Sequence, residues 1–132
     1  MNRRAECRCG QLSVTVTGEP IRISVCHCLA CQRRTGSPFA AQARFEGADV
    51  TFEGESNSWV QVADSGNEAV FHWCPKCGCD VWYQGGSPVP GAIAIPIGLF
   101  ADPGFPAPNF SVWEERKHQW VEILGDQVEH FD

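Results

Sequence analysis

The chain contains many short runs in which apolar and polar residues alternate, with the period of two that β-strands require. Leu12, Val14 and Val16 are separated by polar residues, which predicts a half-buried strand. Similar runs, several of them rich in β-branched or aromatic residues, are bounded by glycine, proline, asparagine and aspartate. On these criteria we expect further strands at residues 21–25, 39–45, 50–53, 58–62, 69–73, 80–84 and 92–97.

Turn signals join these strands and leave little room for helix. The strands at 58–62 and 69–73 flank Asp64-Ser65-Gly66-Asn67, which predicts a β-hairpin. Residues 32–35 are expected to make one helical turn before Gly36-Ser37-Pro38 ends it.

The C-terminal part of the sequence is less regular. Residues 85–91 and 101–109 are rich in glycine or proline and are expected to be loops. Residues 114–117 fit a helical turn with a charged, solvated face, and residues 120–123 fit an extended segment. The whole pattern predicts a single, mainly β domain over residues 1–132, a sandwich-like arrangement of many short strands with little helix.

Length and composition are those of an ordinary globular protein. The chain has 132 residues, 43% of them hydrophobic, and its five tryptophans are expected to lie mostly in the core. No apolar run approaches the ~20 residues of a membrane helix, so no membrane association is expected. The first six residues carry charge and are not followed by an apolar segment, so no secretory signal is expected and the predicted location is the cytoplasm.

The charge balance argues against one class of partner. The formal net charge is −6 with neutral histidines, and metal-bound thiolates would make it more negative. Such a surface is not expected to bind nucleic acid by general electrostatic attraction. The basic pair beside the central cysteines, Arg33-Arg34, is either a solvated turn or an anchor for an anionic substrate group.

Eight cysteines fall in three tight clusters, and this distribution decides the candidate chemistry. Four disulfides would also use eight thiols, but C-x-C and C-x-x-C pairs are poorly placed to bridge internally, and the cytoplasm keeps thiols reduced. Thiolate sulfur instead selects zinc, cuprous copper or iron–sulfur chemistry. The clusters are Cys7 and Cys9; Cys26, Cys28 and Cys31; and Cys74, Cys77 and Cys79.

The spacing divides these thiols between two metal sites. Cys7-x-Cys9-Gly10 and Cys74-x-x-Cys77-Gly78 each offer two sulfurs followed by a glycine, and two such pairs make a four-sulfur structural site. The central three cysteines supply a second site. Cys79 is a candidate for the fourth ligand there, and the main competing arrangement exchanges it with Cys77. We expect two zinc ions, because nothing in the sequence indicates electron transfer; iron remains the alternative.

The ordered motifs resemble one known family. C-x-C-G near the N-terminus, C-H-C-x-x-C followed by T-G-S-P-F, and then C-P-x-C-G look like the glutathione-dependent formaldehyde-activating enzyme (GFA) family. Residues 98–103 and 111–120 are similar to that family's C-terminal pattern, so the likeness covers nearly the whole chain. The resemblance implies a zinc-bound β fold of twisted sheets. It also implies a structural zinc at Cys7, Cys9, Cys74 and Cys77, and a second zinc at Cys26, Cys28 and Cys31.

The resemblance further implies a reaction. The family's namesake activity is the condensation of glutathione with formaldehyde to S-hydroxymethylglutathione, a carbon–sulfur lyase-type reaction. Zinc with a vacant position lowers the pKa of a substrate thiol, and a donor must then stabilise the new oxyanion. The ligands of the second zinc are therefore the candidate catalytic residues. Arg33 and Ser37 are candidate substrate-binding residues, and His27 is a further candidate helper.

Two positions depart from the family's pattern and keep a second hypothesis open. Cys79 stands where many members have a small hydroxyl residue, and a fourth thiolate would fill the vacancy and make zinc a poorer Lewis acid. Ser111 stands where some members carry a histidine. The alternative is a non-catalytic zinc module that binds a small anionic thiol or a protein partner.

The remaining conspicuous side chains have ordinary interpretations. His27 lies between two cysteines, so alternation is expected to point it away from their metal, toward a neighbouring residue or solvent. His72 is expected to be an ordinary strand residue, and His118 and His130 are expected to be exposed. Gly36-Ser37-Pro38 is either a simple turn or part of a pocket lining.

Overall fold

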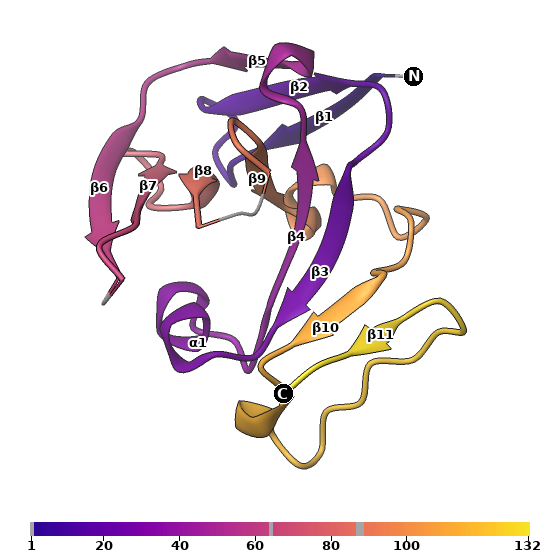
Figure 1. Ribbon diagram of the computed structural model, residues 1–132. Coiled ribbons are helices and arrows are strands. Elements are labelled where there is room, and N and C mark those ends of the chain that lie inside the picture. The colour runs from indigo at the N-terminus through magenta and orange to yellow at the C-terminus, as the bar shows by residue number, and fades with distance from the viewer. Residues whose placement is uncertain (1, 64, 87–88) are drawn as a thin grey trace.

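The computed structural model describes residues 2–63, 65–86 and 89–132 (Figure 1). Asp64 of the expected hairpin turn and Ser87 and Pro88 of the expected loop lie outside the described residues, as does Met1. The strands are β1 (Asn2–Glu6), β2 (Ser13–Thr17), β3 (Arg22–Cys26), β4 (Ala40–Phe45), β5 (Val50–Glu53), β6 (Asn57–Val62), β7 (Glu68–Trp73), β8 (Asp80–Gly85), β9 (Ile93–Pro96), β10 (Phe110–Val112) and β11 (Glu129–His130). The helical elements are α1 (Leu29–Thr35) and the 3₁₀ turns η1 (Gly47–Asp49), η2 (Ile97–Phe100) and η3 (Glu114–Arg116).

The described strands form two sheets. The smaller sheet has the order β1-β2-β5, and the larger has the order β11-β10-β3-β4-β9-β8-β7-β6. Neighbouring strands pair antiparallel except around β10, which runs parallel to both β3 and β11. The fold is therefore mainly β, as the alternation predicts. No helix in the described part of the chain is long and apolar enough to cross a membrane.

One apolar core draws on both sheets. Val14 and Val16 of β2, Ala43 and Phe45 of β4 and Ile95 of β9 are all fully buried and belong to a single cluster. Burying an aliphatic or aromatic side chain of this size stabilises the fold by about 1.5–3 kcal/mol. In Figure 1 the small sheet lies across one end of the large sheet, and the cluster contains residues of both sheets.

The expected hairpin and helical turn are both present. β6 and β7 pair antiparallel with Trp59 opposite Phe71, as predicted for residues 58–62 and 69–73. α1 begins three residues earlier than the predicted turn, because Cys28 caps it: the Cys28 Sγ accepts a hydrogen bond from the backbone N–H of Cys31.

Three strands have no counterpart in the sequence prediction. Only Ala5 is buried among the five residues of β1, so no alternation marks it. β10 and β11 have three and two residues and exist through long-range pairing. Residues 120–123, in contrast, were expected to be extended but form no strand.

The prediction that the tryptophans lie mostly in the core is wrong for three of the five. Trp59, Trp113 and Trp120 are 58%, 52% and 74% exposed, and Trp73 and Trp82 are half-buried. Trp59 lies on β6, which is the edge of the large sheet and has no covering layer over most of its residues. Aromatic residues mark a β-strand by their propensity, which does not say how deeply the strand is buried.

Candidate metal centres and adjoining cavity

Four cysteines from two distant turns meet at one point. Cys7 and Cys9 lie between β1 and β2, and Cys74 and Cys77 lie between β7 and β8. Their four sulfur atoms all lie within 4.8 Å of one another. We call these residues the first group. Because β1 and β2 belong to the small sheet and β7 and β8 to the large one, the first group connects the two sheets.

Both turns of the first group are shaped by a glycine with positive φ. The Gly10 N–H donates to the Cys7 carbonyl at 3.0 Å, and the Gly78 N–H donates to the Cys74 carbonyl at 2.8 Å. Gly10 has φ 84° and Gly78 has φ 77°, a left-handed conformation that residues with a Cβ adopt at a cost. The glycine after each cysteine pair therefore allows the chain to fold back around its two sulfurs.

The sulfur spacing of the first group fits a tetrahedral metal ion. The Sγ atoms of Cys7 and Cys9 are 3.6 Å apart, and those of Cys9 and Cys74 are 3.7 Å apart. Four sulfurs at 2.3 Å from a zinc ion would be separated by about 3.8 Å. A disulfide would need about 2.05 Å. All eight cysteines are free, so the donor set suits a metal ion.

Gln11 supports the first group and was not identified from the sequence. Its Nε2 donates to the Cys74 Sγ at 3.1 Å and to the Glu55 carbonyl at 2.6 Å, while its Oε1 accepts from the Glu55 N–H at 3.0 Å. Burial raises the pKa of the Cys74 thiol, but hydrogen bonds from the Cys77 backbone, Gln11 and the Lys76 backbone lower it to about 6. These donors stabilise a thiolate, the form that binds metal.

The three central cysteines also come together. Cys26 ends β3, Cys28 caps α1 and Cys31 lies in the first turn of α1, so a strand end and a helix start supply all three sulfurs. The sulfurs lie within 4.8 Å of one another. We call these residues the trio.

Cys31 is the cysteine of the trio whose thiol ionises most readily. A hydrogen bond from the Cys26 thiol, together with one from Cys28 and the nearby Arg34, lowers the pKa of Cys31 to about 5 despite burial. The Nη2 of Arg34 lies 4.0 Å from the Cys31 sulfur. The same hydrogen bond raises the pKa of Cys26. One thiolate stabilised by its neighbours is the starting point for binding a cation.

The structure does not bring Cys79 to the trio. Cys79 belongs to neither set of clustered sulfurs, and its Sγ lies 3.8 Å from the carbonyl oxygen of Asp80. The Cys74 N–H donates to the Cys79 carbonyl at 2.9 Å, so Cys79 lies beside the first group. Burial raises the pKa of its thiol, as do the charges of Cys77 and Cys7. The competing arrangement, in which Cys79 replaces Cys77 in the first group, also differs from the geometry.

Metal content of two variants tests this assignment. Cys79→Ser is expected to keep both metal ions, whereas Cys77→Ser is expected to lose the ion of the first group. Inductively coupled plasma mass spectrometry on the purified, reduced proteins gives the metal-to-chain ratio directly. Loss of an ion from the Cys79 variant alone would show that the two cysteines have exchanged roles.

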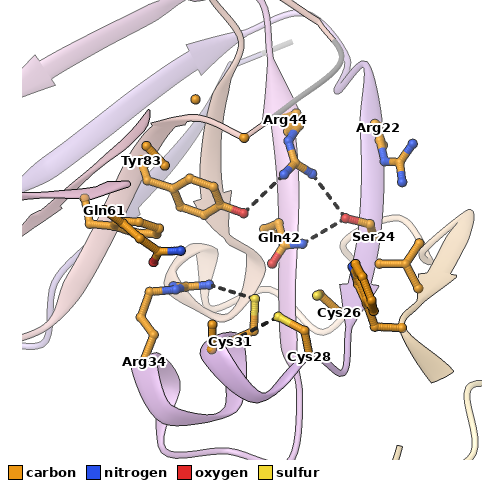
Figure 2. Close-up of a pocket in the computed structure, with 17 residues that line it drawn as sticks. Arg22, Ser24, Cys26, Cys28, Cys31, Arg34, Gln42, Arg44, Gln61 and Tyr83 are labelled. Carbon is orange, nitrogen blue, oxygen red and sulfur yellow. Dashed lines mark hydrogen bonds between the residues drawn. The ribbon is translucent and has the colours of Figure 1, made fainter. Parts of the chain in front are cut away.

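The trio opens into a cavity of about 330 Å³ (Figure 2). β3 and β4 form its floor, in register: Cys26, Ser24 and Arg22 alternate along β3 and lie opposite Ala40, Gln42 and Arg44 of β4. Residues of α1, β6, β7, β8 and β10 and their flanking turns complete the lining, namely Cys28, Ala30, Cys31, Arg34, Gln61, Ala69, Phe71, Tyr83, Gly85, Gly86, Val112 and Trp113.

The floor of this cavity is polar, although it lies in the middle of the sheet. Ser24 Oγ accepts hydrogen bonds from Gln42 Nε2 at 2.9 Å and from Arg44 Nη1 at 3.3 Å. Arg44 Nη2 donates to the Tyr83 hydroxyl at 3.3 Å. Ser24, Gln42 and Arg44 are 1%, 3% and 8% exposed. One signal in the sequence could have found them, a charged or polar residue at every second position of two otherwise apolar strands.

Arg34 stands between the trio and a second cavity. It forms an ion pair with Asp80, and its guanidinium lies 5.2 Å from the Phe71 ring and 5.1 Å from the Tyr83 ring. The second cavity, of about 710 Å³, has Trp59 and Trp73 in its wall and shares Arg34 with the first. Of the basic pair, Arg34 therefore faces the trio and Arg33 does not.

The two predicted substrate-binding residues lie outside the trio's cavity. Arg33 lines only the second cavity and is exposed. Ser37 lines neither; its Oγ accepts a hydrogen bond from the Phe39 N–H at 3.4 Å, and its own N–H donates to Thr35 Oγ1 at 3.1 Å. Ser37 is thus placed in the turn that follows α1.

His27 is fully buried and points into the protein. Ser111 donates its only hydroxyl hydrogen to Glu114 Oε2 at 2.6 Å, so the 2.9 Å bond between Ser111 Oγ and His27 Nε2 is donated by His27. His27 Nδ1 has no hydrogen-bond partner in the described chain, and burial lowers the pKa of the imidazole. His130 also contacts Glu114, at 2.8 Å. His27 thus faces a neighbouring residue and not solvent, and Glu114 is half-buried, not on a solvated face.

The fold and these thiols define a class: a β-sheet protein with one four-cysteine group and one three-cysteine group, both suited to a metal ion, the second beside a cavity. The sequence model of the glutathione-dependent formaldehyde-activating enzyme family matches residues 2–116, and the chain belongs to this family.

A solved structure supports the fold. The crystal structure of a Rhodobacter sphaeroides protein, a structural genomics target, matches with a TM-score of 0.56 and 21% sequence identity, over 73% of this chain and 85% of that chain. No curated protein matches the sequence. The likeness to the Rhodobacter sphaeroides protein concerns the arrangement of the strands alone.

Proposed function

We propose that this protein is a zinc-dependent enzyme of the carbon–sulfur lyase type, which joins formaldehyde or a related aldehyde to a small thiol such as glutathione. The observation that carries the proposal is the trio: three clustered sulfurs that line a cavity, with no fourth cysteine among the described residues in their group. Membership of the GFA family supports the same reaction.

The chain offers distinct places for two zinc ions. The first group, with four sulfurs at tetrahedral spacing, would hold a structural ion, and the trio would hold an ion that keeps one position for substrate. Zinc bound there would lower the pKa of a substrate thiol, so that a thiolate is present at neutral pH. Eight free thiols fit a reducing compartment such as the cytoplasm.

In the proposed reaction, the substrate sulfur forms a bond to the formaldehyde carbon as the carbonyl electron pair moves to oxygen. The thiol proton finishes on that oxygen, so the product, S-hydroxymethylglutathione, contains every atom of the two reactants. We assign to Arg34 the stabilisation of the developing oxyanion, because its guanidinium lies 4.0 Å from the Cys31 sulfur and is held by Asp80. Arg34 takes this role in place of Arg33 and Ser37, which lie outside the cavity.

The alternative, a non-catalytic zinc module, depends on a closed second site. Cys79 was the candidate for closing it, and Cys79 lies beside the first group instead. The geometry therefore favours the enzyme over the module.

Exchange spectroscopy by NMR tests the proposal. The zinc-loaded protein is expected to increase the exchange rate between hydrated formaldehyde and S-hydroxymethylglutathione in proportion to its concentration. Protein depleted of zinc by a chelator should give the uncatalysed rate, and reloading should restore the exchange. Equal exchange with and without the loaded protein would remove glutathione and formaldehyde as reactants.

A further inference from the structure

Two arginines lie side by side on neighbouring strands of the cavity floor without an acidic partner. Arg22 of β3 lies directly opposite Arg44 of β4. Neither forms an ion pair with a carboxylate of the described chain, and no described aspartate or glutamate lines the cavity. Like charges directly opposite on paired strands destabilise a sheet, so an unneutralised pair calls for an explanation.

Burial makes this arrangement more costly. Arg44 is only 8% exposed, and a buried cation is expected to be paired with an anion. Arg22 packs its guanidinium 4.1 Å from the Phe110 ring, and its Nε is buried without a hydrogen-bond partner in the described chain. Burial and the charge of Arg44 lower the pKa of Arg22, the direction expected for a cation that lacks a counter-ion. The protein as a whole is acidic, which makes the local absence of a carboxylate more notable.

Polar groups beside the arginines also lack partners. Ser24 accepts hydrogen bonds from Gln42 and Arg44, which leaves its own hydroxyl hydrogen to donate. Gln42 Oε1 is buried without a donor in the described chain. The floor thus offers three donors for an anion, on Arg22, Arg44 and Ser24, next to one acceptor, Gln42 Oε1, that lacks a donor in the described chain.

We propose that Arg22 and Arg44 form a carboxylate-binding site that selects the thiol substrate. Ser24 supplies a further donor to the carboxylate, and Gln42 Oε1 accepts from an N–H of the same ligand. The ligand class is an amino-acid or peptide thiol. The carboxylate site follows from the two arginines and does not depend on the proposed reaction. The placement of the ligand's sulfur at the trio rests on the proposed function.

The floor also limits the size of the ligand. Ser24 and Cys26 point to the same face of β3 and are two residues apart, about 7 Å along a strand. Arg44 reaches the level of Ser24, where it donates to the hydroxyl. A ligand that spans both positions carries its carboxylate several bonds from its sulfur, as cysteinyl peptides do.

Binding of S-methylglutathione, measured by isothermal titration calorimetry on the zinc-loaded protein, tests the site. This probe keeps the carboxylates but has no free thiol to add to an aldehyde. We expect its Kd to rise about 10- to 100-fold in both Arg44→Gln and Arg22→Gln. Arg4→Gln is the matched control, because Arg4 is exposed, lies on β1 and pairs with Glu6. The Kd of this variant for S-methylglutathione should stay within about twofold of the wild-type value.

The diethyl ester of S-methylglutathione, in which both carboxylates are blocked, allows the arginine substitutions to be combined with removal of the ligand's charge. Esterification should weaken binding to the wild type about as much as the arginine substitutions do, with a much smaller further loss in the variants. This pattern identifies the carboxylate as the partner, which a general loss of structure in a variant would not reproduce. The half-exposed position of Arg22 makes Arg22→Gln the safer variant if Arg44→Gln folds poorly.

The result can be read separately from the proposed function. Arginine-dependent binding of S-methylglutathione without formaldehyde exchange would support the carboxylate site and remove the reaction. Formaldehyde exchange with wild-type kcat/KM in both variants, together with equal binding of the probe, would keep the reaction and overturn the carboxylate site. Failure of the wild type to bind S-methylglutathione would overturn it as well.

Discussion

Replacing Cys9 by serine is expected to unfold the protein or to lower its Tm by about 15 °C or more. Cys9 is exposed, so the substitution removes a candidate metal ligand without creating a cavity in the core. Structural zinc contributes about 10–16 kcal/mol in small zinc domains, as much as the whole unfolding free energy of an ordinary domain. Losing even about 4 kcal/mol of this would give the expected shift for a chain of this length.

The first group has this large effect because of where it lies. It holds the β1–β2 turn of the small sheet against the β7–β8 turn of the large sheet, and Cys7 and Cys74 are themselves part of the core. Cys79→Ser is the matched control, the same chemical change at a half-buried cysteine outside both groups. Thermal unfolding followed by circular dichroism compares the two variants. Equal Tm values for them would contradict a structural role for the first group.

Replacing Cys31 by serine is expected to abolish formaldehyde exchange while the fold survives. The trio lies at the end of β3 and the start of α1, and no residue of α1 is buried in the core. The variant should therefore keep one metal ion and lose only a few degrees of Tm. Lewis-acid activation is worth several kcal/mol, so the catalysed rate should fall by at least about 10²-fold.

Leu29→Ala provides the control for this second variant. Leu29 belongs to α1, is 43% exposed and lines neither cavity, so its removal perturbs the helix without touching the trio. It should retain two metal ions and near-wild-type exchange. Exchange spectroscopy and metal analysis on the same samples separate the two cases. Full activity of the Cys31 variant would place the reaction elsewhere.

The fold was predictable where one face of a strand meets the core. In β2 the apolar positions Val14 and Val16 are fully buried and Thr15 between them is not, so alternation in the sequence reports burial directly. The alternation of apolar and polar residues does not reveal β1, because its side chains are mainly polar and exposed. β1 becomes a strand by pairing with β2. Pairing between distant segments is a tertiary effect that no local pattern contains.

The candidate site divides in a similar way. Most of the two thiol groups follows from spacing, because cysteines two or three residues apart lie close together; Cys79, two residues from Cys77, is the exception and joins neither group. The polar floor of the cavity does not, since Ser24, Gln42 and Arg44 occupy strand positions that a sequence reader assigns to solvent. They face a cavity instead, because residues of α1 and of the strands β6 to β8 line the space in front of that face of β3 and β4. Figure 1 shows α1 and β6 to β8 on the same side of β3 and β4.

The parallel pairing of β10 with β3 bears on how the protein is made. Cys26, Cys28 and Cys31 leave the ribosome early, but the strand that ends at Cys26 has β4 on one side only until Phe110–Val112 arrives. The three thiols therefore lie beside a strand whose second neighbour comes from the last quarter of the chain. The first group differs, because its four sulfurs are all present only once Cys74 and Cys77 have followed Cys7 and Cys9. The trio is therefore complete in the sequence by residue 31, and the first group only by residue 77.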